Sequence, residues 1–193
     1  MIKGVLFDLD GTLLDTSEGI QESVKYAIHA LKRPMLSKHE LLQFVGPPIQ
    51  NSLITFLGLN PEDAQLGATI FRNYYKEKAL YKANVYEGIF GMLDYLKQKY
   101  IKIGVATYKR EDYAKTLLTH FGISPYCNVI HGADNDNKLR KADIVAMCCR
   151  ELGCEHSQIA LVGDTVHDAE GAYKAGVRFI AVTWGFGYKK ENV

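Results

Sequence analysis

The sequence lacks the features that mark several large classes of protein. Its formal net charge is only +1 over 193 residues, so no strongly basic surface points to a nucleic-acid partner. No apolar run is long enough to cross a membrane, and the apolar stretch at the N-terminus ends at Asp8, too early for a signal peptide. We therefore expect a cytoplasmic protein with neither nucleic-acid nor membrane partners.

Cysteine is also scarce. The chain has four, at positions 127, 148, 149 and 154, and none of them has C-x-x-C spacing. We expect reduced thiols rather than a disulfide framework. Hydrophobic residues make up 47% of the chain and charged residues 23%, which is typical of a globular protein with a packed core.

What the sequence does contain is an alternation of two patterns. Short runs rich in β-branched residues predict strands, and segments with helical periodicity separate them. This order is typical of βαβ units and predicts an α/β fold, with a Rossmann-like parallel sheet flanked by helices. The expected strands are residues 2–9, 101–106, 127–131, 159–162 and 179–183, and the expected helices are 88–99, 111–121 and 141–152.

One connection is too long for a simple crossover between strands. It contains several helix-start signals, including Ser37 and Glu40 at capping-box spacing and Asn60 before Pro61. We predict a small all-helical cap domain in this connection. The predicted division is 16–83 for the cap, and 1–15 with 84–193 for the α/β catalytic core.

Acidic residues follow two of the predicted strands. Asp8 and Asp10 end the first strand, and because they are two residues apart in an extended chain, their side chains point the same way. Asp164 and Asp168 follow the fourth strand. Ligands of an open parallel sheet bind at the carboxyl ends of its strands. Carboxylates gathered there repel one another, and such a set of hard oxygen ligands predicts a Mg²⁺ site.

Three segments carry a more specific signal. Residues 8–15 read DLDGTLLD, Thr107 ends an apolar run, and residues 163–168 read GDTVHD. They resemble the first, second and fourth motifs of the haloacid dehalogenase-like (HAD) hydrolase superfamily. Residues 44–48 (FVGPP) and 184–187 (WGFG) look like the phosphoglycolate phosphatase-like branch of that superfamily, and the resemblance covers nearly the whole chain.

The resemblance implies a role for each acid. Asp8 would be the nucleophile that forms an aspartyl-phosphate, and Asp10 would be the general acid and base. Mg²⁺ would be bound by Asp8, the backbone carbonyl of Asp10, and Asp164, while Asp168 would orient a metal-bound water or the lysine of the family. Thr107 is expected to take part in catalysis and in substrate binding. The other expected substrate-binding residues are Thr12, Gly46, Tyr108 and Lys109, with a plain loop position as the alternative for Gly46.

The third motif of the family, a lysine that pairs with the nucleophile and the phosphate, is less clear. The frequent KPxP form is absent, and Lys141 before Ala-Asp-Ile-Val matches the other form of the motif. Lys138, Lys109 and Arg140 are the alternatives. Asp168 also has a second interpretation, because it has capping-box spacing from Thr165.

We expect a Mg²⁺-dependent phosphatase that hydrolyses a small soluble phosphate monoester, with phosphoglycolate as the family-level candidate, and that acts as a monomer or homodimer. A phosphomutase of the β-phosphoglucomutase type would use the same Asp8 and Asp10. A nucleotidase or pyrophosphatase of the superfamily is a further alternative. A receiver domain also collects acids around Mg²⁺, but its acceptor aspartate ends a later strand, and residues 127–131 end without one.

Overall fold

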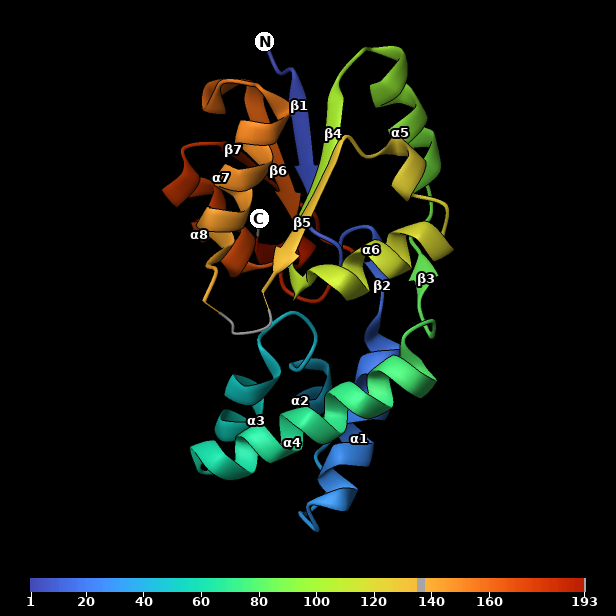
Figure 1. The fold of residues 1–193 in the computed structure, drawn as a ribbon, viewed down its shortest axis with the longest axis vertical. Coiled ribbons are helices and arrows are strands. Elements are labelled where there is room, and N and C mark those ends of the chain that lie inside the picture. Colours follow the sequence, from blue (N-terminus) through green and yellow to red (C-terminus); the bar gives the residue numbers. More distant parts are fainter. Residues whose placement is uncertain (135–137, 193) are drawn as a thin grey trace. The chain divides into compact units, whose positions relative to one another are not determined.

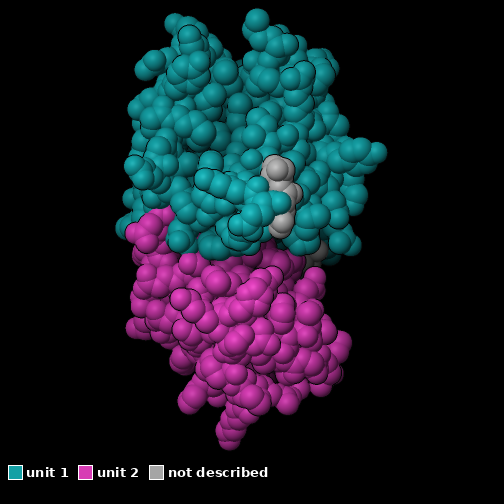
Figure 2. Space-filling view, turned by 180° about the vertical axis from the view of Figure 1, so that it is seen from behind, with its two compact units in different colours: residues 1–15, 85–193 teal, residues 16–84 magenta. Residues whose placement is uncertain are grey.

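The chain folds into two compact units, which Figure 2 shows in different colours. The structure is a computed structural model and describes residues 1–134 and 138–192. Unit 1 comprises Met1–Asp15 and Val85–Val193, and unit 2 comprises Thr16–Asn84. Within the described residues, no helix combines the length and the apolar character that crossing a membrane requires.

Unit 1 is built around a five-stranded parallel sheet with the order β5-β4-β1-β6-β7. The N-terminal strand is central and fully buried, which explains why it is a continuous apolar run. Each strand lies where a short apolar run predicted it, so the prediction of an α/β fold with a parallel sheet is confirmed. The strands are β1 (Gly4–Phe7), β4 (Lys102–Arg110), β5 (Val129–Ala133), β6 (Ile159–Gly163) and β7 (Arg178–Ala181).

Helices flank this sheet. Figure 1 shows α7 and α8 to the left of the strands and α5 to their right. A buried cluster joins Leu6 and Leu161 of the sheet to Ile144 and Cys148 of α7. The cysteines are free thiols, as expected. The helices of this unit are α5 (Ile89–Gln98), α6 (Glu111–His120), α7 (Lys141–Leu152) and α8 (Val166–Ala175), with short 3₁₀ turns at Ser124–Tyr126, His156–Gln158 and Lys190–Asn192.

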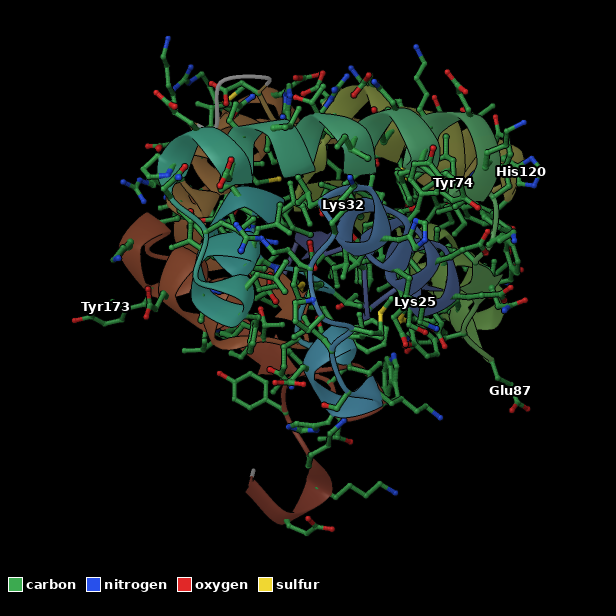
Figure 3. The ribbon with its side chains drawn as sticks, turned by 90° about the horizontal axis from the view of Figure 1, so that it is seen from below. Lys25, Lys32, Tyr74, Glu87, His120 and Tyr173 are labelled. Atoms are coloured by element: carbon green, nitrogen blue, oxygen red, sulfur yellow. The ribbon has the colours of Figure 1, made fainter. Side chains whose placement is uncertain are left out.

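Unit 2 is helical. The predicted capping box is present before α2, where the Ser37 N–H donates to the Glu40 carboxylate at 2.8 Å. Asn60 caps α4 by accepting from the Asp63 N–H at 2.8 Å. The Tyr74 hydroxyl, labelled in Figure 3, donates to Glu22 of α1 at 2.7 Å and fastens α4 to α1. The elements are α1 (Ser17–Ala30), α2 (Lys38–Leu42), α3 (Ile49–Leu57), α4 (Pro61–Tyr74) and a π-helical turn (Tyr75–Ala79).

Two short strands were not predicted. β2 (Leu14–Asp15) and β3 (Asn84–Val85) pair in a two-stranded sheet. Each has only two residues, too few for any alternation of polar and apolar positions to show in the sequence.

One local prediction was wrong. We expected Thr107 to close its strand, but β4 continues to Arg110, with a shift of register against β5 between Ala106 and Arg110. Within this irregular stretch the hydroxyl of Thr107 accepts a hydrogen bond from the Lys109 N–H at 3.1 Å. The Lys109 N–H thus bonds to a side chain in the place of a neighbouring strand, and β4 continues beyond this irregularity.

Candidate active site

The register of the sheet brings acids from separate strands to one edge. Phe7 of β1 lies opposite Val162 of β6 and Val105 of β4. Asp8 directly follows Phe7, and Asp164 comes two residues after Val162. Both carboxylates are buried just beyond the carboxyl edge of the sheet, where ligands of such sheets bind.

Lys141, the first residue of α7, places its ammonium between two carboxylates. Its Nζ lies 2.8 Å from Asp8 Oδ1 and 2.6 Å from Asp168 Oδ1. Only 2% of Lys141 is exposed, and a lysine is buried to this extent almost only when it is paired. Lys138 is exposed, and its backbone N–H donates to Asp134. The geometry therefore favours Lys141 as the lysine of the site, and its role stays a prediction.

Asp168 combines the two interpretations that its position in the sequence left open. Its Oδ2 accepts from the Thr165 N–H at 3.0 Å and from the Thr165 hydroxyl at 2.8 Å, which closes the first turn of α8. Its Oδ1 faces Lys141. Asp168 is thus both a helix cap and a partner of the buried lysine.

Asp10 is paired with a second lysine. Lys109 Nζ lies 2.9 Å from Asp10 Oδ1 and 3.2 Å from Oδ2, and only 6% of the lysine side chain and 8% of the aspartate side chain are exposed. The sequence predicted Lys109 to bind substrate phosphate. In the structure its ammonium is directed to Asp10, and the substrate-binding role stays a prediction.

Asp164 lies against the turn within the first motif. Gly11 has φ +80°, and a Cβ there would lie 2.3 Å from Asp164 Oδ2, so only glycine can occupy this turn. The hydroxyl of Thr12, which is buried, lies 3.5 Å from Asp164 Oδ1. Thr12 is therefore close to the predicted metal ligand, and its predicted contact with substrate stays untested.

Burial dominates the ionisation of these groups. It raises the pKa of Asp8 to about 7, with Lys141 opposing the rise and the neighbouring aspartates adding to it. Burial also raises the pKa of Asp164 to about 6, although backbone N–H donors oppose that rise. For Asp168 burial acts in the same direction, but the charge and hydrogen bond of Lys141 together with the hydrogen bonds from Thr165 outweigh it and lower the pKa below its usual value. The same pairing raises the pKa of Lys141 despite its burial.

The site has a surplus of negative charge. Four buried carboxylates face two ammonium groups, which leaves a formal excess of two negative charges when all are ionised. Asp8, Asp164 and Asp168 offer oxygen atoms that lie within 4.8 Å of one another. Both Asp168 oxygens have partners within 3.0 Å, whereas the nearest partner of Asp164 Oδ1 is the Thr12 hydroxyl at 3.5 Å, so Asp8 and Asp164 are better placed to hold an ion. Hard oxygen donors with this charge suit Mg²⁺.

Tyr108 contacts the start of α7. Its hydroxyl accepts from the Lys141 N–H at 3.0 Å, its ring lies 5.7 Å from Lys141 Nζ, and it meets the His167 ring edge to face. These contacts position Lys141, whereas the predicted contact of Tyr108 with substrate stays untested. Gly46 belongs to unit 2, in the loop between α2 and α3 with φ +103°, and its substrate-binding role also stays a prediction.

We expect Tyr108→Phe to lower both the rate and the stability. The substitution removes only the hydroxyl, so the Lys141 N–H loses its acceptor, which costs about 1–3 kcal/mol when a buried donor is left unpaired. Thermal melting and steady-state kinetics would measure both effects. The matched control is Tyr173→Phe, since Tyr173 on α8 points outward and is 86% exposed (Figure 3). Equal melting temperatures for the two variants would contradict the positioning role.

Some residues that shape the site were not singled out. A Cβ at Gly171 of α8 would lie 2.4 Å from Lys141 Cγ, so this glycine makes room for the stem of the buried lysine. Phe186 belongs to the WGFG segment that the resemblance singled out, but its contact with the site was not predicted: its N–H donates to Asp164 Oδ2 at 2.7 Å. Gly171 lies three residues after Asp168 and therefore on the same face of α8. That spacing is the one sequence feature from which its position near the site could have been predicted.

Fold and site together define a Rossmann-like α/β protein with an acidic site at the carboxyl edge of its sheet. Residues 5–182 match the model of the haloacid dehalogenase-like hydrolase family. This match includes Asp8, Lys141 and Asp168. The chain belongs to the haloacid dehalogenase-like hydrolase family, as its motifs predicted.

Individual relatives carry different names. Tyrosine-protein kinase PtkA of Mycobacterium tuberculosis is 33% identical over 184 residues, which are 95% of this chain and 62% of the kinase. The chain thus spans less than two thirds of the length of that relative. A 5'-nucleotidase of Pseudomonas aeruginosa is 31% identical over 190 residues, 97% of this chain and 85% of the nucleotidase. The crystal structure of a predicted phosphatase from Clostridium acetobutylicum matches with a TM-score of 0.92 and 34% identity, covering 100% of this chain and 89% of that chain.

Proposed function

We propose that the chain is a Mg²⁺-dependent phosphatase that hydrolyses a small phosphate monoester through an aspartyl-phosphate. The observation that carries the proposal is the contact of Asp8 with Lys141 inside a buried cluster that also contains Asp164 and Asp168. A carboxylate that attacks a phosphate must have positive charge beside it. Lys141 supplies one such charge, and Mg²⁺, when bound, would offset the charge on the phosphoryl oxygens.

The proposed reaction has two steps. Asp8 attacks phosphorus, and the bond to the alcohol oxygen breaks while Asp10 donates a proton to that oxygen. Asp10 then takes a proton from a water molecule whose oxygen attacks phosphorus and releases Asp8. Lys109, at 2.9 Å from Asp10 Oδ1, orients the general acid. Asp8 and Asp164, with the backbone carbonyl of Asp10, would hold the metal ion.

The acceptor of the phosphoryl group is the point on which relatives differ by name. PtkA is named a tyrosine kinase, a name that implies a hydroxyl acceptor. The Pseudomonas relative is named a 5'-nucleotidase and the neighbour of 34% identity a predicted phosphatase, names that both imply transfer to water. A phosphomutase or kinase would pass the group from Asp8 to a hydroxyl instead of water. We propose water as the acceptor, and we keep the prediction that residues 16–83 form a cap that favours small substrates.

A panel of phosphate monoesters tests the proposal. Release of inorganic phosphate would be measured from phosphoglycolate, sugar phosphates, nucleotides and p-nitrophenyl phosphate, with and without a sugar bisphosphate activator. Multiple turnover to inorganic phosphate without activator supports a phosphatase. Turnover that depends on the bisphosphate identifies a mutase. Transfer from ATP to tyrosine, with no phosphate released from any ester, would overturn the proposal in favour of a kinase.

Chelation should silence the enzyme. We expect excess EDTA to remove turnover and added Mg²⁺ to restore it, because the surplus negative charge around Asp8 opposes the approach of a phosphate. Mg²⁺ should also raise the melting temperature of the protein, since an ion that binds only the folded state stabilises it. Turnover would be followed with p-nitrophenyl phosphate and melting by circular dichroism.

Asp164→Asn provides the control for that experiment. It removes one ligand charge, so we expect the stabilisation by Mg²⁺ to shrink strongly in this variant while the protein remains folded. Full activity in chelator, or an equal stabilisation of the variant and the wild type by Mg²⁺, would contradict the metal assignment.

A further inference from the structure

The segment Trp184–Tyr188, which follows β7, returns to the site and holds Asp164 by its backbone. The Phe186 N–H donates to Asp164 Oδ2 at 2.7 Å, and the Tyr188 N–H donates to the Asp164 carbonyl oxygen at 2.8 Å. Asp164 is therefore fixed at its main chain and at its carboxylate by one short stretch of chain.

The segment approaches Asp164 so closely that positions 185 and 187 have no room for a side chain. A Cβ at Gly185 would lie 2.4 Å from Asp164 Oδ2 and 2.4 Å from the carbonyl oxygen of Gly11. A Cβ at Gly187 would lie 2.3 Å from the carbonyl oxygen of Asp164. The neighbours at both positions include backbone oxygens, which cannot turn aside as the end of a flexible side chain can. The two glycines let the Phe186 N–H reach the carboxylate and the Tyr188 N–H reach the carbonyl oxygen of Asp164.

Trp184 anchors the segment to the turn of the first motif. Its indole Nε1–H donates to the carbonyl oxygen of Thr12 at 3.2 Å. The ammonium of Lys189 donates to the carbonyl oxygen of Gly185 at 2.9 Å at the other end. The segment thus ties the turn after Asp10 to Asp164, the two parts of unit 1 that would share a metal ion.

The two oxygens of Asp164 consequently have different surroundings. Oδ2 accepts the Phe186 N–H and lies against Gly11 and Gly185, whereas Oδ1 has the hydroxyl of Thr12 at 3.5 Å. We infer that the segment Trp184–Tyr188 is a positioning element that commits Oδ2 to the protein and presents only Oδ1 to a cation. The inference rests on the Mg²⁺ site of the proposed function.

One consequence is ion selectivity. Mg²⁺ takes six ligands in strict octahedral geometry and suits a carboxylate that offers one oxygen, whereas Ca²⁺ takes six to eight and accepts both oxygens of a carboxylate. Holding Oδ2 away from the ion therefore favours Mg²⁺ over Ca²⁺. Releasing Oδ2 would let Asp164 bind through both oxygens, which lowers the affinity for Mg²⁺ more than that for Ca²⁺.

Calorimetric titration of the full chain with MgCl₂ and with CaCl₂ tests this role. We expect Gly187→Ala to weaken Mg²⁺ binding about 10-fold or more, the range typical of groups that orient a metal ligand. The ratio of Mg²⁺ to Ca²⁺ affinity should fall at the same time. Trp184→Phe, which removes the indole N–H donor together with part of the ring at a half-exposed site, should lower the ratio in the same direction but less.

The matched control is Gly91→Ala. Gly91 lies in α5, and a Cβ there has no atom within 4 Å, so this variant should keep the wild-type ratio. A folded Gly187→Ala protein with the wild-type ratio of Mg²⁺ to Ca²⁺ affinity overturns the inference. If Gly187→Ala does not fold, a wild-type ratio of these affinities in Trp184→Phe overturns it instead. If the wild type binds no Mg²⁺, the inference and the metal assignment both fail. If the ratio shifts as expected but no ester is hydrolysed, the inference holds and the proposed phosphatase function fails.

Discussion

Asp8→Asn should abolish turnover of phosphate monoesters, by about 10⁴-fold or more, because an amide cannot serve as the nucleophile and groups that act as a unit fail together. The protein should still melt within about 3 °C of the wild type. Burial already raises the pKa of Asp8 to about 7, so above that pH the folded protein carries an unfavourable charge that the amide removes. Lys141 keeps its other partner, Asp168, at 2.6 Å.

The control for this variant is Asp112→Asn at the start of α6. The side chain of Asp112 is 55% exposed and paired with Arg110, so its loss should leave turnover unchanged. Borohydride trapping or a fluoride mimic of the phosphoryl group would place the covalent step directly. Residual wild-type activity in Asp8→Asn, or a label on any other residue, would move the nucleophile elsewhere.

Lys141→Ala has the second-largest expected effect, and it should change both rate and stability. The rate should fall about 10²- to 10³-fold, as is typical when one preorganised stabilising group is removed. Stability should fall by about 3–5 kcal/mol, because Asp8 and Asp168 would be left buried without their cation. Steady-state kinetics at a temperature well below melting, together with urea unfolding, would separate the two effects.

Lys138→Ala is the matched comparison, since Lys138 lies three residues earlier and is exposed. It should retain a rate within about 3-fold of the wild type, as most surface substitutions do. A second variant, Lys141→Met, keeps most of the buried stem beside Gly171 and removes only the charge. If Lys138→Ala lost more rate than Lys141→Ala, the lysine of the site would have been chosen wrongly.

The sequence predicted the sheet and the acidic edge well, for a physical reason. Buried parallel strands must be short apolar runs, and the carboxyl ends of such strands meet at one edge. The residue after β1 and the residue after β6 were therefore expected to be neighbours, and Asp8 and Asp164 do lie in one cluster. Lys141 was favoured by the residues that follow it, and the structure places it in that cluster.

Other features depended on contacts that no local pattern records. The continuation of β4 beyond Thr107 depends on a register shift against β5. The contact of Gly185 and Gly187 with Asp164 arises only when the chain after β7 returns to the site. The sequence offered two interpretations of Asp168 as alternatives, whereas its two oxygens allow both at once. The spacing of residues in the sequence predicts which side chains lie near the site, whereas the partner of each oxygen atom depends on tertiary contacts.

Asp168 caps the first turn of α8 and also contacts the ammonium of Lys141, so local unfolding of that turn affects the position of the ammonium. The Asp168 N–H donates to the Thr165 carbonyl at 3.1 Å in the turn that the Asp168 side chain closes. When that turn frays, the carboxylate swings away and the ammonium of Lys141 loses its support. Amide hydrogen exchange at residue 168 would therefore measure how often the ammonium is misplaced. The fraction of molecules in which this turn is closed is therefore an upper limit on the fraction that are ready to react.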